Sequence, residues 1–457
     1  MKLKPRPQYL SKLVAAQDNS LIKVITGMRR CGKSSLLTLF RQHLLQQGIA
    51  EDHIIMMNLE SFQYSSFTFE DLHNAIADRM QQDDHYYLLL DEVQLVDKWE
   101  RAVNALHTDA DVDITITGSN AYLLSSQLAT LLSGRYMEIN VFPLSFAEFM
   151  AYADLTDENA AFERYTRYGG LPPVVNQGTD QNLAYTVLSG IYDTILVRDI
   201  SQFLQVRNPL VFNDVARYLA DTAGSPVSTS KIENRLRSAH RPASNETIER
   251  YISGLLNAFL FYNAQRINVK GGAYLQGLAK YYPADLGIRN MLLGYSIEDF
   301  GFLLENAVHN ELKIRGYQIR VGKIGKAEID FVATRKHADL TEEKLYIQVS
   351  ASILDEHTRE RELSPLLNAR DLSAKRMVLT LDRFGLGKSD GVTVANAIDW
   401  MLGKVTPFQD FLTFTQFKSS VCTSRIWERF RGDADAERIR ADGDNRQQRA
   451  AYANTPH

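Results

Sequence analysis

The sequence predicts an α/β protein of two or three domains, in which the N-terminal part is an αβα sandwich. An apolar run at residues 21–26 precedes a glycine-containing loop, and the large apolar residues after the loop recur at helical spacing. A second apolar run at 86–90 ends in two adjacent carboxylates, Asp91 and Glu92. A chain of 457 residues is longer than one hydrophobic core usually fills, so further domains are expected after the first.

The loop at residues 27–34 reads GMRRCGKS and matches G-x-x-x-x-G-K-[ST], the pattern of a P-loop. Its glycines let backbone N–H groups face inward, where they and the start of the helix bind phosphates. Lys33 supplies a positive charge for the β and γ phosphates, and the Ser34 hydroxyl is placed to bind Mg²⁺. We therefore expect ATP and Mg²⁺ as cofactors. The predicted nucleotide-binding residues are Gly27, Met28, Arg29, Arg30, Cys31, Gly32, Lys33, Ser34 and Ser35.

The run that ends in two carboxylates has the form of a Walker B strand. Asp91 is expected to share the Mg²⁺ with Ser34, and Glu92 is the candidate general base that activates the attacking water. The structural alternative is a pair of acids that cap a buried strand. A glutamate directly after the aspartate favours hydrolysis over phosphoryl transfer to another molecule.

A further predicted strand at 113–117 ends in polar residues that are candidates to contact the γ phosphate or position the water. These are Thr117, Ser119 and Asn120, and the sequence does not choose among them, although Asn120 enters our set of catalytic candidates. A helix N-cap by Ser119 or Asn120 is the alternative. Arg135, in a polar break before the next strand, is a candidate arginine finger or sensor, in cis or in trans. An ordinary surface salt bridge is its alternative.

Eight segments of the chain carry a resemblance to a known family. They are 27–34, 90–94, 116–121, 132–136, 142–149, 168–172, 282–287 and 305–306. Together they resemble prokaryotic AAA-type ATPases that carry a C-terminal restriction-endonuclease-like domain of unknown function. The resemblance extends to about residue 403. It implies ATP binding by an αβα nucleotide domain, followed by helical, winged-helix and nuclease-like parts, and it implies no particular physiological role.

This organisation gives five expected parts. They are an AAA-type P-loop ATPase core at 1–155, a helical lid at 156–222, a winged-helix-like domain at 223–295, a PD-(D/E)XK-like domain at 296–405 and a tail at 406–457 that is partly disordered. Two helix breakers, Pro172 and Pro173, follow a Gly-Gly pair in the lid. Arg198 in the lid is a candidate second sensor, and an ion pair with Asp199 or a nearby acid is the alternative.

The winged-helix-like part is predicted to contain two helices, with Ser228 or Ser230 as the first N-cap and Ser244 before the second. Basic residues on or near the helix expected to read DNA and in the wing are candidates to neutralise DNA phosphates. Many winged helices contact only protein, which is the alternative. The basic residues are Arg235, Arg237, His240, Arg241, Arg250, Arg266 and Lys270.

Glu305, Asp330 and Gln348 follow one another in the order of a PD-(D/E)XK nuclease, in which Asp330 and Gln348 would share a divalent ion. Ser350 stands where the catalytic lysine belongs. Without that cation to help activate water and stabilise the charge of the transition state, nuclease activity is not expected. We interpret this part as a degenerate nuclease fold used for binding.

The composition excludes some classes of protein. The formal net charge of −4 gives no overall basic character, so any contact with nucleic acid has to be a local patch. No run of 18 apolar residues occurs, and the two cysteines, Cys31 and Cys422, suit a reducing compartment. We expect a soluble, cytoplasmic protein without a membrane partner. Because Cys31 lies near a helix N-terminus, a lowered thiol pKa and redox sensitivity are one hypothesis, and a neutral spacer is the other.

Two functions from different classes remain. The first is a Mg²⁺-dependent ATPase that couples its nucleotide state to a C-terminal module for double-stranded DNA or protein. The second is a STAND-like switch or scaffold that is gated by nucleotide and turns over slowly. An active nuclease is a third, against which Ser350 argues. An oligomer is compatible with either function, and the sequence identifies neither the partner nor the biological process.

Overall fold

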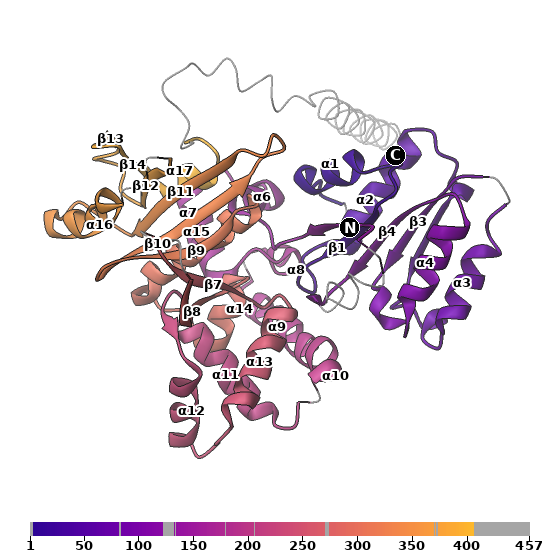
Figure 1. Cartoon of the computed structure of the whole chain (residues 1–457), viewed down its shortest axis with the longest axis horizontal. Helices are drawn as coiled ribbons and strands as arrows, with labels where there is room; N and C mark the ends of the chain where they lie inside the picture. The colour runs from indigo at the N-terminus through magenta and orange to yellow at the C-terminus, as the bar shows by residue number, and fades with distance from the viewer. Residues whose placement is uncertain are drawn as a thin grey trace, which may run out of the picture. The chain divides into compact units, whose positions relative to one another are not determined.

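The computed structural model describes residues 3–81, 84–121, 132, 134–178, 180–204, 206–269, 274–369, 371 and 373–405. The predicted tail at 406–457 and Lys270 of the predicted wing lie outside the described residues. Residues 1–405 belong to one compact unit. Their backbone forms two sheets with helices around them (Figure 1).

The first sheet has five parallel strands in the order β2-β3-β4-β1-β5. The strands are β1 (Ile22–Thr26), β2 (Ile54–Asn58), β3 (Tyr86–Asp91), β4 (Val112–Gly118) and β5 (Tyr136–Asn140). Strand β4 pairs with both β1 and β3, so one strand is inserted between the P-loop strand and the Walker B strand. Every residue of β1 and β3 is buried, because helices cover both faces of a parallel sheet.

Alternate residues of each strand supply the two faces of this sheet. Val24 and Leu88 pack with helices α3 and α4, whereas Ile25 and Leu89 pack with helices α1 and α2. These helices are α1 (Pro7–Ala15), α2 (Lys33–Gln46), α3 (Phe69–Ala77) and α4 (Trp99–Asp109), and they lie on the two sides of the strands in Figure 1. The N-terminal part is therefore the αβα sandwich of a P-loop NTPase, as the sequence predicts.

Helices dominate the chain between the two sheets. They are α6 (Phe146–Ala153), α7 (Glu158–Tyr168), α8 (Pro172–Val175), α9 (Gln181–Thr194), α10 (Ser201–Leu204), α11 (Pro209–Asp221), α12 (Thr229–Ser238), α13 (Asn245–Asn257) and α14 (Leu286–Leu293). The caps of α12 and α13 are Ser228 and Ser244, so Ser230 is not a cap. A π-helical turn, Ile195–Ile200, joins α9 to α10. None of the helices in the described part of the chain is long and apolar enough to cross a lipid bilayer.

The second sheet has nine strands in the order β13-β14-β12-β11-β10-β9-β7-β8-β6. The strands are β6 (Pro226–Val227), β7 (Phe261–Asn268), β8 (Tyr274–Pro283), β9 (Gln318–Ile324), β10 (Ala327–Lys336), β11 (Glu342–Ser350), β12 (Lys375–Thr380), β13 (Gly387–Ser389) and β14 (Val392–Asn396). Its helices are α15 (Phe300–Ile314), α16 (Glu356–Asn368) and α17 (Ala397–Met401). Because β7 pairs in parallel with β9, the sheet runs across the boundary expected at residue 295.

Candidate nucleotide site

The P-loop connects β1 to α2 through two glycines in left-handed or related conformations. Gly27 has φ +140°, and a Cβ there would lie 2.1 Å from the carbonyl oxygen of Val141. Gly32, the N-cap of α2, has φ +109°. No other residue type adopts both conformations without strain. The loop therefore reaches the N-terminus of α2 in the tight turn that the motif predicts.

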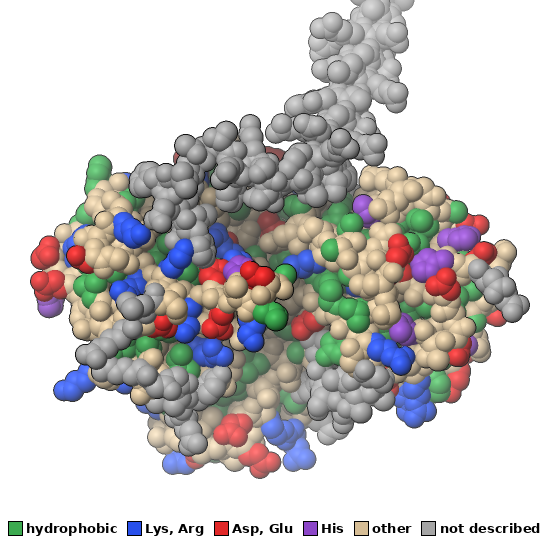
Figure 2. Space-filling model, turned by 45° about the horizontal axis from the view of Figure 1, so that its top comes forward, with side chains coloured by type: hydrophobic (Ala, Val, Ile, Leu, Met, Phe, Trp, Pro, Cys, Tyr) green, Lys and Arg blue, Asp and Glu red, His purple; other side chains and the backbone are tan. Residues whose placement is uncertain are grey.

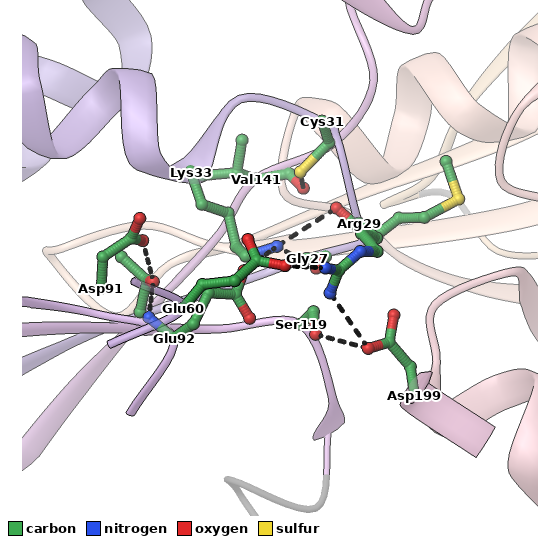
Figure 3. Close-up of polar contacts among 12 residues, drawn as sticks. Gly27, Arg29, Cys31, Lys33, Glu60, Asp91, Glu92, Ser119, Val141 and Asp199 are labelled. Carbon is green, nitrogen blue, oxygen red and sulfur yellow. Dashed lines mark hydrogen bonds and ion pairs between the residues drawn. The ribbon is translucent and has the colours of Figure 1, made fainter. Parts of the chain in front are cut away.

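Lys33 is the first residue of α2, and its side chain is buried. Its Nζ donates to the carbonyl oxygens of Gly27 and Met28 at 3.0 and 3.3 Å and lies 3.6 Å from Oε1 of Glu92 (Figure 3). The ammonium thus lies between the loop and the end of β3. A cation in this place can neutralise the terminal phosphates of a nucleotide held by the loop.

The two predicted Mg²⁺ ligands lie together. The Ser34 side chain lies near enough to the Asp91 carboxylate to help lower its pKa, and Thr117 donates its hydroxyl to Asp91 Oδ1 at 2.5 Å. Burial raises the pKa of Asp91, and Thr117 and Ser34 oppose this rise. Thr117 therefore holds the Asp91 carboxylate at the end of β3.

Glu92 directly follows β3 and has φ +56°, an uncommon conformation for a residue with a side chain. Its N–H donates to Thr117 Oγ1 at 2.9 Å, and Gln94 Nε2 donates to its Oε2 at 2.5 Å. Burial acts to raise the pKa of Glu92, but Lys33, Gln94 and Arg29 together lower it below its ordinary value. The carboxylate is thus ionised at neutral pH, as a general base must be.

The other two candidates at the end of β4 contact the helical segment that follows the core. Ser119 Oγ donates to Asp199 Oδ1 at 3.1 Å, and Asn120 Nδ2 donates to the backbone oxygen of Asp199 at 2.9 Å. Both side chains are buried. The predicted helix after Asn120 begins in residues outside the described part, so the N-cap alternative has no structural outcome.

Arg29 of the P-loop joins this region through two acids. Its Nη2 lies 2.5 Å from Oε1 of Glu60, and its Nη1 lies 3.4 Å from Oδ1 of Asp199. Glu60 also pairs with Arg198 at 2.7 Å. The predicted second sensor, Arg198, therefore makes an ion pair with a nearby acid, which was the alternative for this residue.

A cavity of about 270 Å³ lies at this junction. It is lined by Arg29, Gln94, Leu95, Ser119, Asn120, Arg198 and Asp199. These residues come from the P-loop, from the carboxyl ends of β3 and β4, and from the π-helical turn. In an open parallel sheet the carboxyl ends of the strands form the usual ligand edge.

Cys31 does not have a lowered thiol pKa, and this hypothesis was wrong. Its Sγ is buried and donates to the carbonyl oxygen of Val141 at 3.1 Å. Burial raises the pKa of the thiol, and the charges of Lys33 and Arg6 do not reverse the rise. Cys31 is therefore a neutral spacer that fixes the loop to the end of β5.

The remaining predicted residues differ in exposure. Met28 is buried and packs into the helical core that follows, whereas Arg30, Ser34 and Ser35 are exposed. Arg135 is exposed just before β5, and its backbone oxygen accepts from the N–H of Ile22 at 2.9 Å. Within the described residues, the guanidinium of Arg135 reaches no other member of the site. Contacts in the structure thus connect Lys33, Asp91, Glu92, Ser119 and Asn120 through shared partners.

Three site residues had no role in the sequence interpretation, namely Glu60, Gln94 and Asp199. Glu60 lies just beyond β2 and Gln94 just beyond β3. The one signal for them was position, since polar residues after parallel strands gather at one edge of the sheet. Asp199 was named only as a partner for Arg198.

A second polar cluster lies in the nine-stranded sheet. Lys280 Nζ on β8 lies 2.8 Å from Glu328 Oε1 and 3.6 Å from Glu305 Oε1, and Tyr282 donates its hydroxyl to Glu305 at 2.8 Å. Burial acts to lower the pKa of Lys280, but Glu305, Asp330 and Glu328 raise it overall. A buried lysine ammonium therefore balances the acids of this cluster.

The expected metal pair of this cluster has a different arrangement. Gln348 Oε1 accepts from the backbone N–H of Asp330 at 2.8 Å, and Gln348 Nε2 donates to Glu362 at 2.8 Å. Asp330 Oδ2 accepts from the N–H of Val349. Within the described residues, no group of three histidine, cysteine or acidic side chains is arranged to hold a metal ion.

The basic residues of the predicted winged-helix part are mostly paired within the chain. Arg235, Arg237 and Arg241 form ion pairs with Asp221, Glu233 and Asp214 respectively. Arg250 donates to the carbonyl oxygen of Leu204, and Arg266 pairs with Glu328. On the face shown in Figure 2, lysine and arginine are interspersed with aspartate and glutamate. The described surface therefore shows no gathered basic patch on that face.

Comparison with known proteins gives two family matches. A family model described as "AAA domain" matches residues 19–150, and a model described as "Domain of unknown function (DUF8612)" matches residues 159–299. Among solved structures, the chain is similar to Cdc6p from Pyrobaculum aerophilum, with 12% identity, a TM-score of 0.28, and coverage of 64% of this chain and 94% of that chain. It is also similar to AMPPCP-bound DnaA from Aquifex aeolicus, with 15% identity, a TM-score of 0.28, and coverage of 56% and 93%.

Two relatives match along most of their length. An uncharacterized protein of Methanocaldococcus jannaschii is 28% identical over 390 residues, which are 82% of this chain and 84% of the relative. An uncharacterized protein of Haemophilus influenzae is 41% identical over 403 residues, which are 87% of this chain and 98% of the relative. The chain therefore belongs to the same family as the uncharacterized Haemophilus influenzae protein, and its N-terminal part matches an AAA domain.

Proposed function

We propose that the protein binds ATP with Mg²⁺ at the P-loop, hydrolyses it, and passes its nucleotide state to the C-terminal part of the chain. The observation that carries this proposal is the arrangement around Lys33. Its ammonium lies 3.6 Å from the Glu92 carboxylate, and its charge and the Ser34 side chain both act to lower the pKa of Asp91. The general base, the phosphate-binding cation and the oxygen ligands thus meet at one edge of the sheet.

Ser34 and Asp91 fit a Mg²⁺ ion because Mg²⁺ prefers oxygen ligands and usually takes only one or two of them from the protein. When bound there, Mg²⁺ would neutralise charge on the phosphate oxygens. The backbone N–H groups of the loop and the start of α2 hold the phosphates, and Lys33 leaves the carbonyl oxygens of its own loop to contact them.

Glu92 acts on the water that attacks the γ phosphate. Its ionised carboxylate accepts a proton from the water as the new oxygen–phosphorus bond forms and the bond from the γ phosphorus to the bridging oxygen breaks, which leaves ADP and phosphate. Gln94 donates to one carboxylate oxygen and Thr117 holds the Glu92 backbone, so the acid is fixed before the substrate arrives. Ser119 and Asn120 are the residues nearest to the lid that can respond to the terminal phosphate.

The parts after the core are proposed as a lid at 156–222, a winged-helix-like domain at 223–295 and a degenerate nuclease-like domain at 296–405. Support for the second comes from the element order α11, β6, α12, α13, β7 and β8, with β8 between β6 and β7. Support for the degeneracy of the third comes from Ser350 and from Lys280 among its acids. The C-terminal module then binds double-stranded DNA or a protein and does not cleave nucleic acid.

A slow, STAND-like switch is the second candidate function. The contacts of Asp199 with Arg29, Ser119 and Asn120 favour it, because they tie the lid directly to the nucleotide site. In either function an exposed Arg135 is available to act in trans within an oligomer.

The test is phosphate release by the purified full-length chain at saturating ATP and Mg²⁺, with and without double-stranded DNA. Repeated turnover supports the ATPase, and stimulation by DNA identifies the class of partner. One stoichiometric turnover followed by retention of ADP supports the switch instead. If the chain binds no nucleotide, both functions are wrong.

A further inference from the structure

Asp199 is a buried carboxylate in the π-helical turn between α9 and α10. Its Oδ1 accepts from Ser119 and faces Arg29 at 3.4 Å (Figure 3). Its backbone oxygen accepts from Asn120. Its Oδ2 is buried and has no hydrogen-bond partner in the described structure. The acid therefore lies at the centre of the contacts between the lid and the nucleotide site.

The surroundings of this carboxylate are poor for a charge. Burial raises the pKa of Asp199 to about 6, even though Arg29 and Ser119 act to lower it. The neighbouring Glu92 acts in the same direction as burial. A π-helical turn within a helix also frequently marks a functional position. These features indicate that the buried Asp199 carboxylate has a functional role and does not serve to stabilise the fold.

A bound nucleotide would compete with Asp199 for Arg29. Arg29 lines one cavity with Gln94, which donates to Glu92, so its guanidinium and the candidate general base lie on the same side of the site. That side is where the γ phosphate of a bound nucleotide is expected. A phosphate binds guanidinium by charge-assisted and often bidentate hydrogen bonds. The bond to Asp199 at 3.4 Å is long by comparison.

We propose that Asp199 is a positioning residue that, together with Glu60, holds Arg29 until a γ phosphate takes its place. When Arg29 turns to the phosphate, the carboxylate loses its cation in a buried site. The turn that carries Asp199 then leaves Ser119 and Asn120, and the lid moves. This inference rests on the proposed ATP site. It explains how the lid distinguishes a triphosphate from a diphosphate.

The first test measures binding of ATPγS and ADP, with Mg²⁺, to wild type and to Asp199→Asn. Since the competing carboxylate is gone, the variant is expected to bind ATPγS about tenfold more tightly, with little change for ADP. Asp193→Asn, a change of the same charge at an exposed position of α9, is the matched control and is expected to bind like wild type. Asp199→Glu keeps the carboxylate. Its affinity for ATPγS relative to ADP is therefore expected to lie between those of wild type and Asp199→Asn.

Equal or weaker binding of ATPγS by a folded Asp199→Asn overturns the proposal. A second measurement uses wild type alone, in case the variant does not fold. Hydrogen exchange of the lid segment 181–204 is expected to rise with ATPγS and not with ADP. No difference between the two nucleotides overturns the proposal. If wild type binds neither nucleotide, the proposed ATP site itself is wrong, which separates the two failures.

Discussion

Replacement of Glu92 by glutamine tests the chemistry of the site in depth, because the two side chains have the same shape. The glutamine retains an oxygen that can accept from Gln94, and its backbone N–H still donates to Thr117. It has no carboxylate to accept the proton of the attacking water. General bases typically contribute a factor of about 10² to 10⁴ in rate, so we expect kcat to fall by that factor.

The same change has an opposite effect on binding. Glu92 and Lys33 are 3.6 Å apart, with side chains that are 10% and 2% exposed. With an effective dielectric constant of about 20, the attraction at this distance is at most roughly 4 to 5 kcal/mol. Glutamine releases Lys33 from this attraction, which leaves the ammonium free for the phosphates. Nucleotide affinity is therefore expected to stay equal or to rise.

The assay pairs single-turnover hydrolysis of ATP with equilibrium binding of a fluorescent ATP analogue. Glu70→Gln, at an exposed position of α3, is the control for a loss of charge far from the site. The expected result is slow hydrolysis with tight binding in Glu92→Gln alone. Hydrolysis within threefold of wild type would refute the role of Glu92 as base. Weaker binding by Glu92→Gln would refute the argument about Lys33.

Further predictions concern stability and the second sheet. Gly27→Ala is expected to destabilise the chain by roughly 2 to 4 kcal/mol, because its Cβ would lie 2.1 Å from the oxygen of Val141, and a Tm equal to that of wild type would contradict this. Burial lowers the pKa of His309 from 6.5 to about 3, so the unfolded state binds more protons in this range. The Tm should therefore fall as pH drops from about 6.5 towards 3, and it should fall less steeply in His309→Gln. Parallel plots of Tm against pH for the two proteins would disprove the lowered pKa of His309. Lys280→Met leaves buried acids without their cation and is expected to lower the free energy of unfolding by about 3 to 5 kcal/mol. A second change, Glu328→Gln, is expected to restore part of this loss. An unchanged Tm in the single variant would speak against the ion pair.

Much of the nucleotide site could be predicted from the sequence because its parts are short local motifs. The glycine spacing and Lys33 specify a loop before a helix, and the acids after an apolar run specify the end of a strand. What the sequence left open was the choice among Thr117, Ser119 and Asn120, since that depends on where neighbouring elements lie.

The contacts that join distant segments could not be predicted. Arg29 meets Asp199, which is 170 residues away, and nothing near either residue specifies the other. The pairing of β7 with β9 also depends on packing of two regions that the sequence presents as separate domains. Lys280 likewise reaches the acids of the nuclease-like part from a strand assigned to the winged-helix-like part.

The central claim is that the P-loop of this chain binds ATP through Lys33. Equilibrium binding of ATP with Mg²⁺ to wild type, Lys33→Ala and the exposed control Lys12→Ala tests it most directly. We predict saturable binding with one site per chain for wild type and Lys12→Ala. Lys33→Ala is expected to lose at least tenfold in affinity, because a charge-assisted contact to phosphate contributes about 1.5 to 3 kcal/mol. Equal affinity of all three proteins, or no binding by wild type, would contradict the claim.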